Sequence, residues 1–281
     1  MIKYNDVLNY WQKNKLESAS DVDLLLHNFR ILFAYNSNKI ENEVITYHDT
    51  REIFENGKIL NFTGDIRTVF EIQNQKECYD FLRDKIASKE QVSLKLIKDI
   101  HLKLTNGTYD ERRFALGEHP GEFKAHDYIT GKNEVGSPPE TVEEDLDLLL
   151  TDILNSEHSP KYNALIVATY LHASFEYIHP FADGNGRVGR TLLNYYLMTH
   201  NYPPLIVFDE DKKDYYTALE KYDTDEALDD LIEFFKQQTI KTWCGSIDRN
   251  SNYIDRSKAL ASACDKNEDD DILPAPDSGR K

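Results

Sequence analysis

The feature that most constrains the fold is an apolar segment at residues 188–197. Its large side chains, Val188, Leu192, Leu193 and Tyr195–Leu197, cover nearly the whole circumference of a helix. A helix that is apolar all round has to be surrounded by other elements, so we expect this one at the centre of a bundle. Another apolar segment of helical period, residues 164–178, precedes it, and a short polar loop separates the two.

Helical periodicity recurs through most of the chain. It predicts a short helix within residues 1–19 and longer ones over about 21–42, 65–87, 94–105, 142–154, 212–221 and 225–243. Residues 107–139 differ, because five glycines and three prolines interrupt the helical period there. Within this stretch, residues 127–135 around Gly131-Lys132 predict a short β-hairpin. The expected fold class is therefore mainly α, a helical bundle with one hairpin.

The distribution of polar residues suggests three parts. We expect an N-terminal helical region at 1–92, a core domain at 93–243 and a polar tail at 244–281. The end of the tail is acidic and contains proline, a composition typical of partial disorder.

Charge and cysteine content limit the partners and the compartment. The net charge is −17, from 50 acidic and 33 basic residues, and such a surface repels nucleic acid and anionic lipid. We therefore expect neither nucleic acid nor a membrane as a partner. No stretch approaches the ~20 apolar residues of a membrane helix. The three cysteines, Cys78, Cys244 and Cys264, are widely spaced, which favours a reducing compartment and a cytoplasmic protein.

The loop between the two apolar segments concentrates chemistry in the run His179-Pro-Phe-Ala-Asp-Gly-Asn-Gly-Arg-Val-Gly-Arg190. The helix that follows it directs free N–H groups and its positive dipole end toward the loop, which favours a phosphate. Gly184 and Gly186 let the backbone approach such a ligand closely, and Asn185 adds a side-chain donor.

Four side chains of the run suit a polyphosphate. Arg187 and Arg190 share a helical face and could grip successive phosphates through forked hydrogen bonds. Asp183 could ligate Mg²⁺ carried by the phosphates, and His179 has an ordinary pKa of ~6.5, suitable for a general base. The plainer alternatives are a helix-end histidine and an ordinary turn. A calcium loop is excluded because two arginines, and no alternating acidic ligands, follow.

The run matches the signature of the Fic family, His-Pro-Phe-x-[Asp/Glu]-Gly-Asn-Gly-Arg-x-x-Arg. The similarity extends over roughly residues 90–240, through segments 96–101, 137–139, 202–204 and 213–219. The chain thus resembles this family, which implies a Fic-type helical bundle. The hairpin would then be a flap beside the active-site loop that aligns the target segment.

The resemblance implies protein adenylylation (AMPylation), the transfer of AMP from ATP to a Ser, Thr or Tyr hydroxyl, with Mg²⁺ as cofactor and pyrophosphate as leaving group. His179 would take the hydroxyl proton and Asp183 would hold the metal. The 184–186 backbone with Asn185 would stabilise the α-phosphate, Arg187 the β-phosphate and Arg190 the γ-phosphate. The retained Gly184 favours nucleotidyl transfer over transfer of phosphate or phosphocholine.

The resemblance also reaches the base of the nucleotide. Tyr215 and Tyr216 would lie near the adenine, and ordinary core aromatics are the alternative for either one. Asp223 stands where some relatives have an asparagine near the base.

A second motif lies upstream. Residues 37–42, Ser-Asn-Lys-Ile-Glu-Asn, fit the inhibitory pattern [Ser/Thr]-x-x-x-Glu-[Gly/Asn] of the self-inhibited class II type of the family. Ser37 and Glu41 are four residues apart on one helical face, and Asn42 completes the pattern. A carboxylate beside Arg190 would take the fork intended for the γ-phosphate. The alternative is that Glu41 is a solvated charge at a helix end.

The sequence therefore predicts a protein adenylyltransferase autoinhibited by Glu41, with ATP and a hydroxyl-bearing protein as its substrates. Two other hypotheses stay open: a de-AMPylating hydrolase in which Glu41 orients a water molecule, and a non-catalytic, nucleotide-responsive interaction module. Self-modification and assembly into a homo-oligomer also stay open, and the sequence does not identify the target.

Overall fold

The computed structural model describes residues 2–59, 62–128 and 136–269, with side chains up to residue 249. Every regular element within these ranges is a helix, which confirms the mainly α fold. In chain order the elements are α1 Tyr4–Trp11, α2 Ala19–Leu25, α3 His27–Glu41, α4 Tyr47–Asn56, α5 Ile66–Ala87, α6 Leu94–Thr105, α7 Glu111–Ala115, α8 Val142–Glu157, α9 Ala164–Ile178, α10 Asn185–Thr199, the 3₁₀ turn η1 Asp209–Asp211, α11 Lys212–Asp225 and α12 Asp229–Asp269.

The hairpin expected at residues 127–135 lies almost wholly outside the described residues. Only residues 127 and 128 belong to the described part of the chain, and neither is in a strand. The flap therefore stays a prediction.

The chain divides into two compact units, residues 1–242 and 243–281. The first unit holds α1 to α11 and the beginning of α12, and it contains every site residue predicted from the sequence. The second holds the later part of α12. The helix expected to end near residue 243 continues to Asp269, which corrects that boundary. No described helix is long and apolar enough to cross a membrane.

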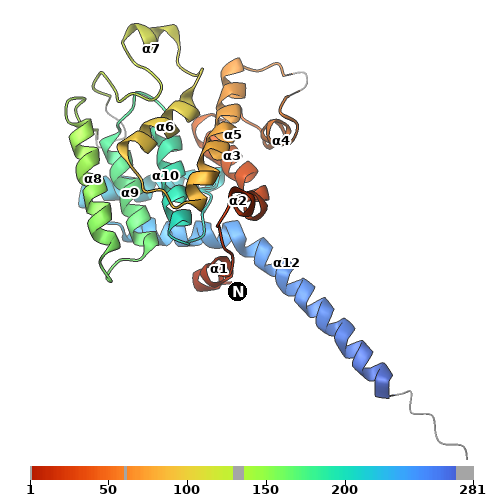
Figure 1. Cartoon of the computed structure of the whole chain (residues 1–281). Coiled ribbons are helices and arrows are strands. Elements are labelled where there is room, and N and C mark those ends of the chain that lie inside the picture. The colour runs from red at the N-terminus through yellow and green to blue at the C-terminus, as the bar shows by residue number, and fades with distance from the viewer. Residues whose placement is uncertain (1, 60–61, 129–135, 270–281) are drawn as a thin grey trace, which may run out of the picture. The chain divides into compact units, whose positions relative to one another are not determined.

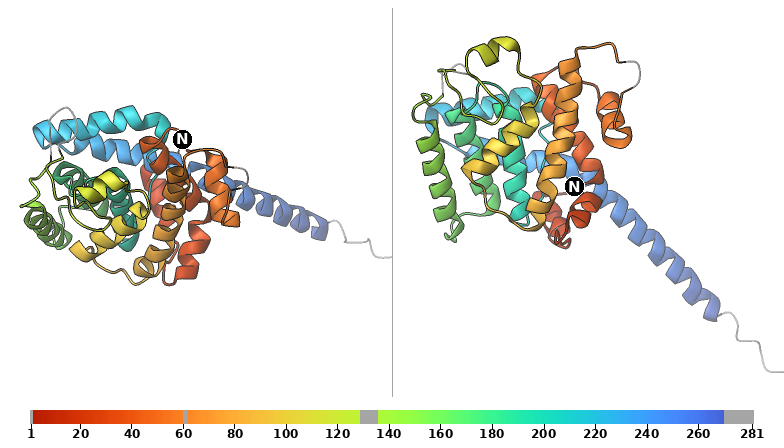
Figure 2. Two further views of the ribbon diagram at one scale, coloured as in Figure 1. Left: turned by 90° about the horizontal axis from the view of Figure 1, so that it is seen from above. Right: turned by 45° about the horizontal axis from the view of Figure 1, so that its top comes forward.

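Helix α10 is the central element of the first unit, as its apolar circumference predicted. Every residue of α10 except Gly186 is buried. It packs against α9, α6, α5 and α3. The N-terminal helices α2 to α5 lie on one side of it and α8 and α9 on the other (Figures 1 and 2). The polar ends of Tyr195 and Tyr196 are satisfied, because their hydroxyls donate to Glu90 O at 2.6 Å and Glu157 Oε1 at 3.1 Å.

The helix predicted over about residues 21–42 is two helices, α2 and α3. Ser18 caps α2 by accepting a hydrogen bond from the Asp21 amide. The backbone leaves helical geometry at Leu26 alone, with φ −96° and ψ 9°, and the Arg30 amide still donates to Leu26 O at 2.9 Å. The interruption is therefore a one-residue kink, and both helices pack on α5.

Candidate active site

The loop at residues 179–184 is formed by two helix ends. Helix α9 ends at His179, whose backbone is left-handed (φ 51°, ψ 60°), and α10 begins after Gly184, which is also left-handed (φ 87°, ψ 4°). A side chain at 184 would be strained by that φ, and its Cβ would lie 2.7 Å from Thr105 Cγ2. Glycine at 184 is therefore required by both backbone and space, and the N-terminus of α10 faces the loop.

Asn185 holds the loop in shape. Its Oδ1 accepts a hydrogen bond from the Phe181 amide at 2.9 Å, and its Nδ2 donates to Phe181 O at 2.7 Å. The sequence suggested a donor to phosphate, whereas both polar side-chain atoms are engaged inside the loop. The role of this residue in the structure is to order the backbone of the loop.

His101 packs against the loop and contacts its backbone, a role that the sequence did not suggest. Its ring stacks on Phe181 with centroids 3.7 Å apart. The Gly121 amide donates to Nδ1 at 2.8 Å, so the remaining ring proton is on Nε2, which lies 3.0 Å from Asp183 O. Burial lowers the pKa of His101 to about 3, so the ring is neutral and structural.

His179, the predicted base, is also neutral at physiological pH. Burial, assisted by the positive charge of Lys124, lowers its pKa to about 4. Backbone hydrogen bonds fix the residues on either side of it, from the Lys124 amide to Pro180 O and from the Ser137 amide to Ile178 O, each 2.9 Å long. A neutral imidazole can accept a proton, as a general base must.

Arg190 meets the upstream motif as the sequence predicted. Its Nη2 donates to Glu41 Oε1 at 2.8 Å and to Ser37 O at 2.9 Å, and its Nε donates to Ser37 Oγ at 3.1 Å. The arginine side chain is 2% exposed. Burial lowers the pKa of Arg190, but Glu41, together with Tyr215, Tyr216 and Glu176, outweighs burial, and the net shift of the arginine pKa is upward. The upstream carboxylate thus occupies the guanidinium assigned to the γ-phosphate.

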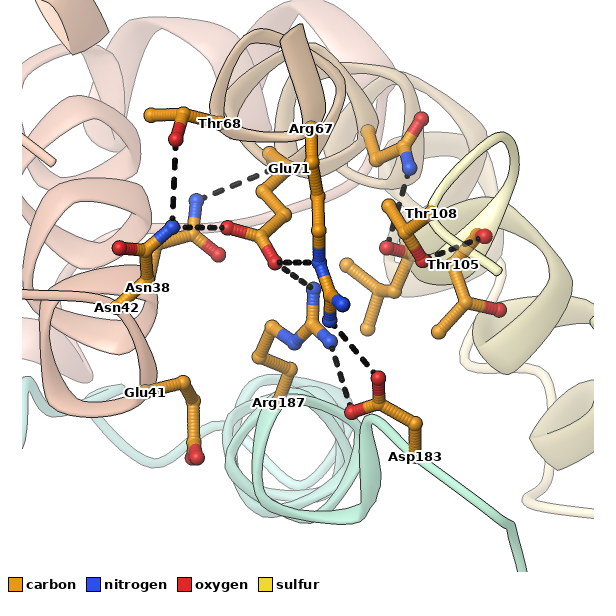
Figure 3. Close-up of polar contacts among 12 residues, drawn as sticks. Asn38, Glu41, Asn42, Arg67, Thr68, Glu71, Thr105, Thr108, Asp183 and Arg187 are labelled. Atoms are coloured by element: carbon orange, nitrogen blue, oxygen red, sulfur yellow. Dashed lines mark hydrogen bonds and ion pairs between the residues drawn. The ribbon is translucent and has the colours of Figure 1, made fainter. Parts of the chain in front are cut away.

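Asp183, the predicted metal ligand, faces three arginines, of which Figure 3 shows Arg67 and Arg187. Its Oδ2 lies 2.9 Å from Arg67 Nη2 and 3.3 Å from Arg113 Nη2, and its Oδ1 lies 3.5 Å from Arg187 Nη2. Burial raises the pKa of this carboxyl, but the three guanidiniums reverse the shift, so the net pKa is lowered. The sequence assigned Arg187 to the β-phosphate and did not predict its contact with Asp183. It missed Arg67 and Arg113, which α5 and α7 bring in without any motif of their own.

Asp183 fits Mg²⁺ only as a ligand shared with a nucleotide. The described residues contain no cluster of three His, Cys, Asp or Glu side chains able to hold a metal ion by themselves. Mg²⁺ is commonly bound by one or two carboxylates together with substrate phosphates. One carboxylate at the N-terminus of α10 matches that second arrangement, so the residues fit a metal that arrives with a polyphosphate.

A cavity of about 210 Å³ lies beside His179 and Arg190. Its lining residues are Glu41, Glu176, His179, Gly186, Arg190, Tyr215, Tyr216, Leu219, Glu220 and Asp223. His179 and Arg190 thus share one cavity with both tyrosines predicted near the adenine. Gly186 is needed here, since a Cβ would lie 2.4 Å from Glu41 Oε1.

The two tyrosines differ in their surroundings. Tyr215 is 1% exposed, and its hydroxyl lies 2.8 Å from His172 Nε2. Tyr216 is 41% exposed. Tyr215 is therefore part of the packed wall, and Tyr216 is the one whose ring a ligand can reach.

Glu176, one turn before His179, is a buried carboxyl that sequence reasoning missed. Burial raises its pKa to about 8, against the opposing effect of Arg190. It fits because residue 189 is glycine: a Cβ there would lie 2.2 Å from Glu176 Oε1. Glu176 is therefore protonated at neutral pH, and the glycine of the Arg-Val-Gly-Arg segment was the only hint of it.

Comparison with known proteins finds one matching family and several relatives. Residues 91–197 match the Fic/DOC family. The chain is 29% identical over 211 residues to "Protein adenylyltransferase Fic" of Drosophila persimilis, covering 74% of this chain and 39% of that protein. It is 26% identical over 249 residues to "Protein adenylyltransferase fic-1" of Caenorhabditis elegans, covering 86% and 46%. The chain therefore spans less than half the length of these relatives.

Solved structures agree on the fold. A Fic domain containing signaling protein from Bacteroides thetaiotaomicron superposes with a TM-score of 0.72 at 20% identity, covering 85% of this chain and 93% of that one. A fragment of Fic-1 from C. elegans (its residues 134–508) gives 0.71 at 23% identity, covering 88% and 71%. The helical fold expected from the sequence is thereby confirmed.

Proposed function

Because the chain carries a Fic/DOC-family domain at residues 91–197, we propose that it is a protein adenylyltransferase held in an autoinhibited state by Glu41. It transfers AMP from ATP to a Ser, Thr or Tyr hydroxyl of a protein, which includes the chain itself as a candidate target. The relatives named protein adenylyltransferase support the reaction. The arrangement of His179, Asp183 and Arg190 around one loop supports the assignment of roles.

The proposed transfer is a substitution at the α-phosphorus. His179 takes the proton of the target hydroxyl, the oxygen bonds to phosphorus, and the bond to the bridging oxygen of the β-phosphate breaks, releasing pyrophosphate. The N–H groups at the start of α10 offset charge on the α-phosphate. Arg187 and Arg190 bind the outer phosphates. Asp183 would hold Mg²⁺, whose charge would further offset that of the phosphates.

One observation carries the proposal of autoinhibition. Glu41 Oε1 accepts a hydrogen bond from Arg190 at 2.8 Å inside the cavity that also holds His179. A γ-phosphate bound to the same guanidinium has to displace Glu41. A charge-assisted hydrogen bond contributes ~1.5–3 kcal/mol, and the exposed side of Glu41 places this contact toward the lower end. That range corresponds to roughly one to two decades in rate.

The test is incubation with labelled ATP and a cell lysate, read by autoradiography and by mass spectrometry of the modified peptides. We expect Glu41→Gly to transfer about ten- to a hundredfold more AMP than wild type, and Glu41→Gly/His179→Ala to transfer none. Glu43→Gly is the matched control, because Glu43 is 80% exposed and pairs with Lys212 instead.

Each hypothesis has its own contrary outcome. Equal transfer by wild type and Glu41→Gly would refute autoinhibition. Nucleotide binding without transfer in any variant would refute the transferase and favour the non-catalytic interaction module.

A second candidate function is hydrolytic removal of AMP from a modified protein. The shared cavity of Glu41 and His179 favours it, since a carboxylate there could orient a water molecule toward a phosphoester. Wild type would then release AMP from a target that Glu41→Gly had modified beforehand, and Glu41→Gly would not. Absence of release by wild type would leave transfer alone.

A further inference from the structure

Asp183, the carboxylate proposed to bind Mg²⁺, already forms ion pairs with three arginines. Arg67 and Arg113 both reach Oδ2 of Asp183, at 2.9 and 3.3 Å, and Arg187 reaches Oδ1 at 3.5 Å. A divalent cation bound to the same oxygens would lie within a few ångströms of these three guanidiniums and be repelled by each. Mg²⁺ therefore cannot take Asp183 until the shortest of these ion pairs opens.

Arg67 makes the shortest of these ion pairs, and its side chain is also held by Glu71. Its Nε donates to Glu71 Oε1 at 3.0 Å, one turn along α5, while its Nη2 donates to Asp183. The Arg67 side chain is 37% exposed, whereas that of Glu71 is 5% exposed. The buried carboxylate of Glu71 therefore orients the more exposed guanidinium of Arg67 toward the loop.

Glu71 also contacts the upstream motif. Its second oxygen, Oε2, accepts a hydrogen bond from Asn42 Nδ2 at 2.8 Å, and Asn42 directly follows Glu41. The same Glu71 lies 3.7 Å from Arg187 Nη1. A continuous path of polar contacts thus runs from Asn42 through Glu71 and Arg67 to Asp183 (Figure 3).

We propose that Arg67 is a further residue of the site, which blocks Asp183 against Mg²⁺ while Asn42 and Glu71 hold it in place. The upstream motif then closes the site at two points. Glu41 occupies the guanidinium of Arg190, and Asn42, acting through Glu71 and Arg67, occupies the carboxylate of Asp183. Movement of α3 releases both. The inference rests on the proposed function in one respect, that Asp183 is the metal ligand.

Metal binding tests this without any turnover. Mn²⁺ with a saturating, non-hydrolysable ATP analogue serves as the probe in place of Mg²⁺ and ATP, because Asp183 shares the metal with a nucleotide. Electron paramagnetic resonance distinguishes Mn²⁺ held at the protein from Mn²⁺ held by the nucleotide alone. Each protein is compared with its Asp183→Asn counterpart, so that binding elsewhere on an acidic surface is subtracted. Arg67→Gln removes the charge and keeps a donor for Glu71. Arg51→Gln is the matched control, because Arg51 makes the same i,i+4 pair with Glu55 on α4.

We expect Arg67→Gln to raise the Asp183-dependent affinity for Mn²⁺ about three- to tenfold and Arg51→Gln to leave it unchanged. Thermal unfolding confirms that each variant is folded. An affinity of Arg67→Gln equal to that of Arg51→Gln would overturn the proposal. So would absence of Asp183-dependent binding in every protein, because Asp183 would then not be a metal ligand. Failure of the adenylyltransferase proposal appears separately, in the AMP-transfer assay.

The link to the upstream motif has its own test. Asn42→Ala removes the hydrogen bond that holds Glu71 Oε2. We expect it to raise Mn²⁺ affinity two- to threefold in an otherwise wild-type chain and to have no effect in Arg67→Gln, since the two act along one path. Equal effects in both backgrounds would show that Asn42 does not act through Arg67.

Discussion

Glu41 Oε1 and Arg190 Nη2, from residues 149 positions apart, are joined by a hydrogen bond of 2.8 Å. The arginine side of the contact is enclosed by protein, while the Glu41 side chain is 37% exposed. The guanidinium therefore stays in place whichever partner it has. The carboxylate is the partner that can leave, so a competing anion can displace it without unfolding the core.

Ser37 should strengthen that contact measurably. Its hydroxyl accepts a hydrogen bond from Arg190 Nε at 3.1 Å, and Ser37→Ala removes this acceptor but keeps Glu41. A hydrogen bond to a charged donor contributes about 1.5 kcal/mol at the low end, so basal AMP transfer should rise up to about tenfold and stay below that of Glu41→Gly. Transfer is measured with labelled ATP. Ser20→Ala, at an exposed position of α2, should equal wild type. No rise in Ser37→Ala would show that the Ser37 hydroxyl does not contribute to inhibition.

Asn185 should matter for stability. Its side chain satisfies both the amide and the carbonyl of Phe181, which is fully buried. Asn185→Ala leaves two buried backbone groups without partners, at a cost of about 2–4 kcal/mol in the free energy of unfolding. Urea unfolding measures the loss. Asn155→Ala, at an exposed position of α8, should change stability by less than about 0.5 kcal/mol. A similarly small change in Asn185→Ala would contradict the role assigned to the side chain.

Glu176 should make stability depend on pH. Its folded-state pKa of about 8 lies above the ordinary 4.5, so the folded protein holds a proton that the unfolded chain releases. Stability is then greatest below pH 4.5 and falls as pH rises to about 8. His101, His172 and His179 act with the opposite sign, because their pKa values are lowered from 6.5, and their effect is complete only about one unit above that pH.

The difference in unfolding free energy between wild type and Glu176→Gln isolates Glu176, because the histidines contribute equally to both proteins. We expect this difference to fall by about 2 kcal/mol from pH 6.5 to 8, since one pKa unit corresponds to 1.36 kcal/mol. Glu143→Gln, at an exposed position of α8, should follow wild type across the interval. Urea titrations at four pH values measure this. A constant difference between wild type and Glu176→Gln would show that the carboxyl is ionised in the folded state.

His179 should remain an active base well below its ordinary pKa. Burial and Lys124 lower the pKa of His179 to about 4, so AMP transfer by Glu41→Gly should persist from pH 8 to about pH 5 and decline below it. Adding Lys124→Met removes the nearby positive charge and should move the decline to higher pH. Lys161→Met, at an exposed position, should not. If AMP transfer declined at the same pH in the two lysine variants, Lys124 would have no electrostatic effect on His179.

The sequence predicted those parts of the molecule that depend on local pattern. The apolar circumference of residues 188–197 placed α10 at the centre. The spacing of Arg187 and Arg190, and of Ser37 and Glu41, followed from helical geometry. The encounter of Glu41 with Arg190 could be predicted only because a family pattern named both partners.

The rest depends on long-range packing that no local pattern records. Arg67 and Arg113 reach Asp183, and Glu71 reaches Arg187, because α5 and α7 pack beside the loop. In the sequence, single arginines or glutamates on those helices cannot be told from solvated charges. The kink at Leu26 was missed for a similar reason, because the apolar period continues through it. Asn185 was assigned to a ligand because an amide near a phosphate site suits both roles equally.

The contact between Glu41 and Arg190 lies within a single chain, and this determines how it responds to concentration. A tethered carboxylate meets its partner at a local concentration that dilution does not change. The contact itself is therefore independent of how much protein a cell makes. The fraction of open molecules is a property of the conformational equilibrium of α3, which is shifted by a ligand that binds one arrangement of the N-terminal helices more tightly than the other.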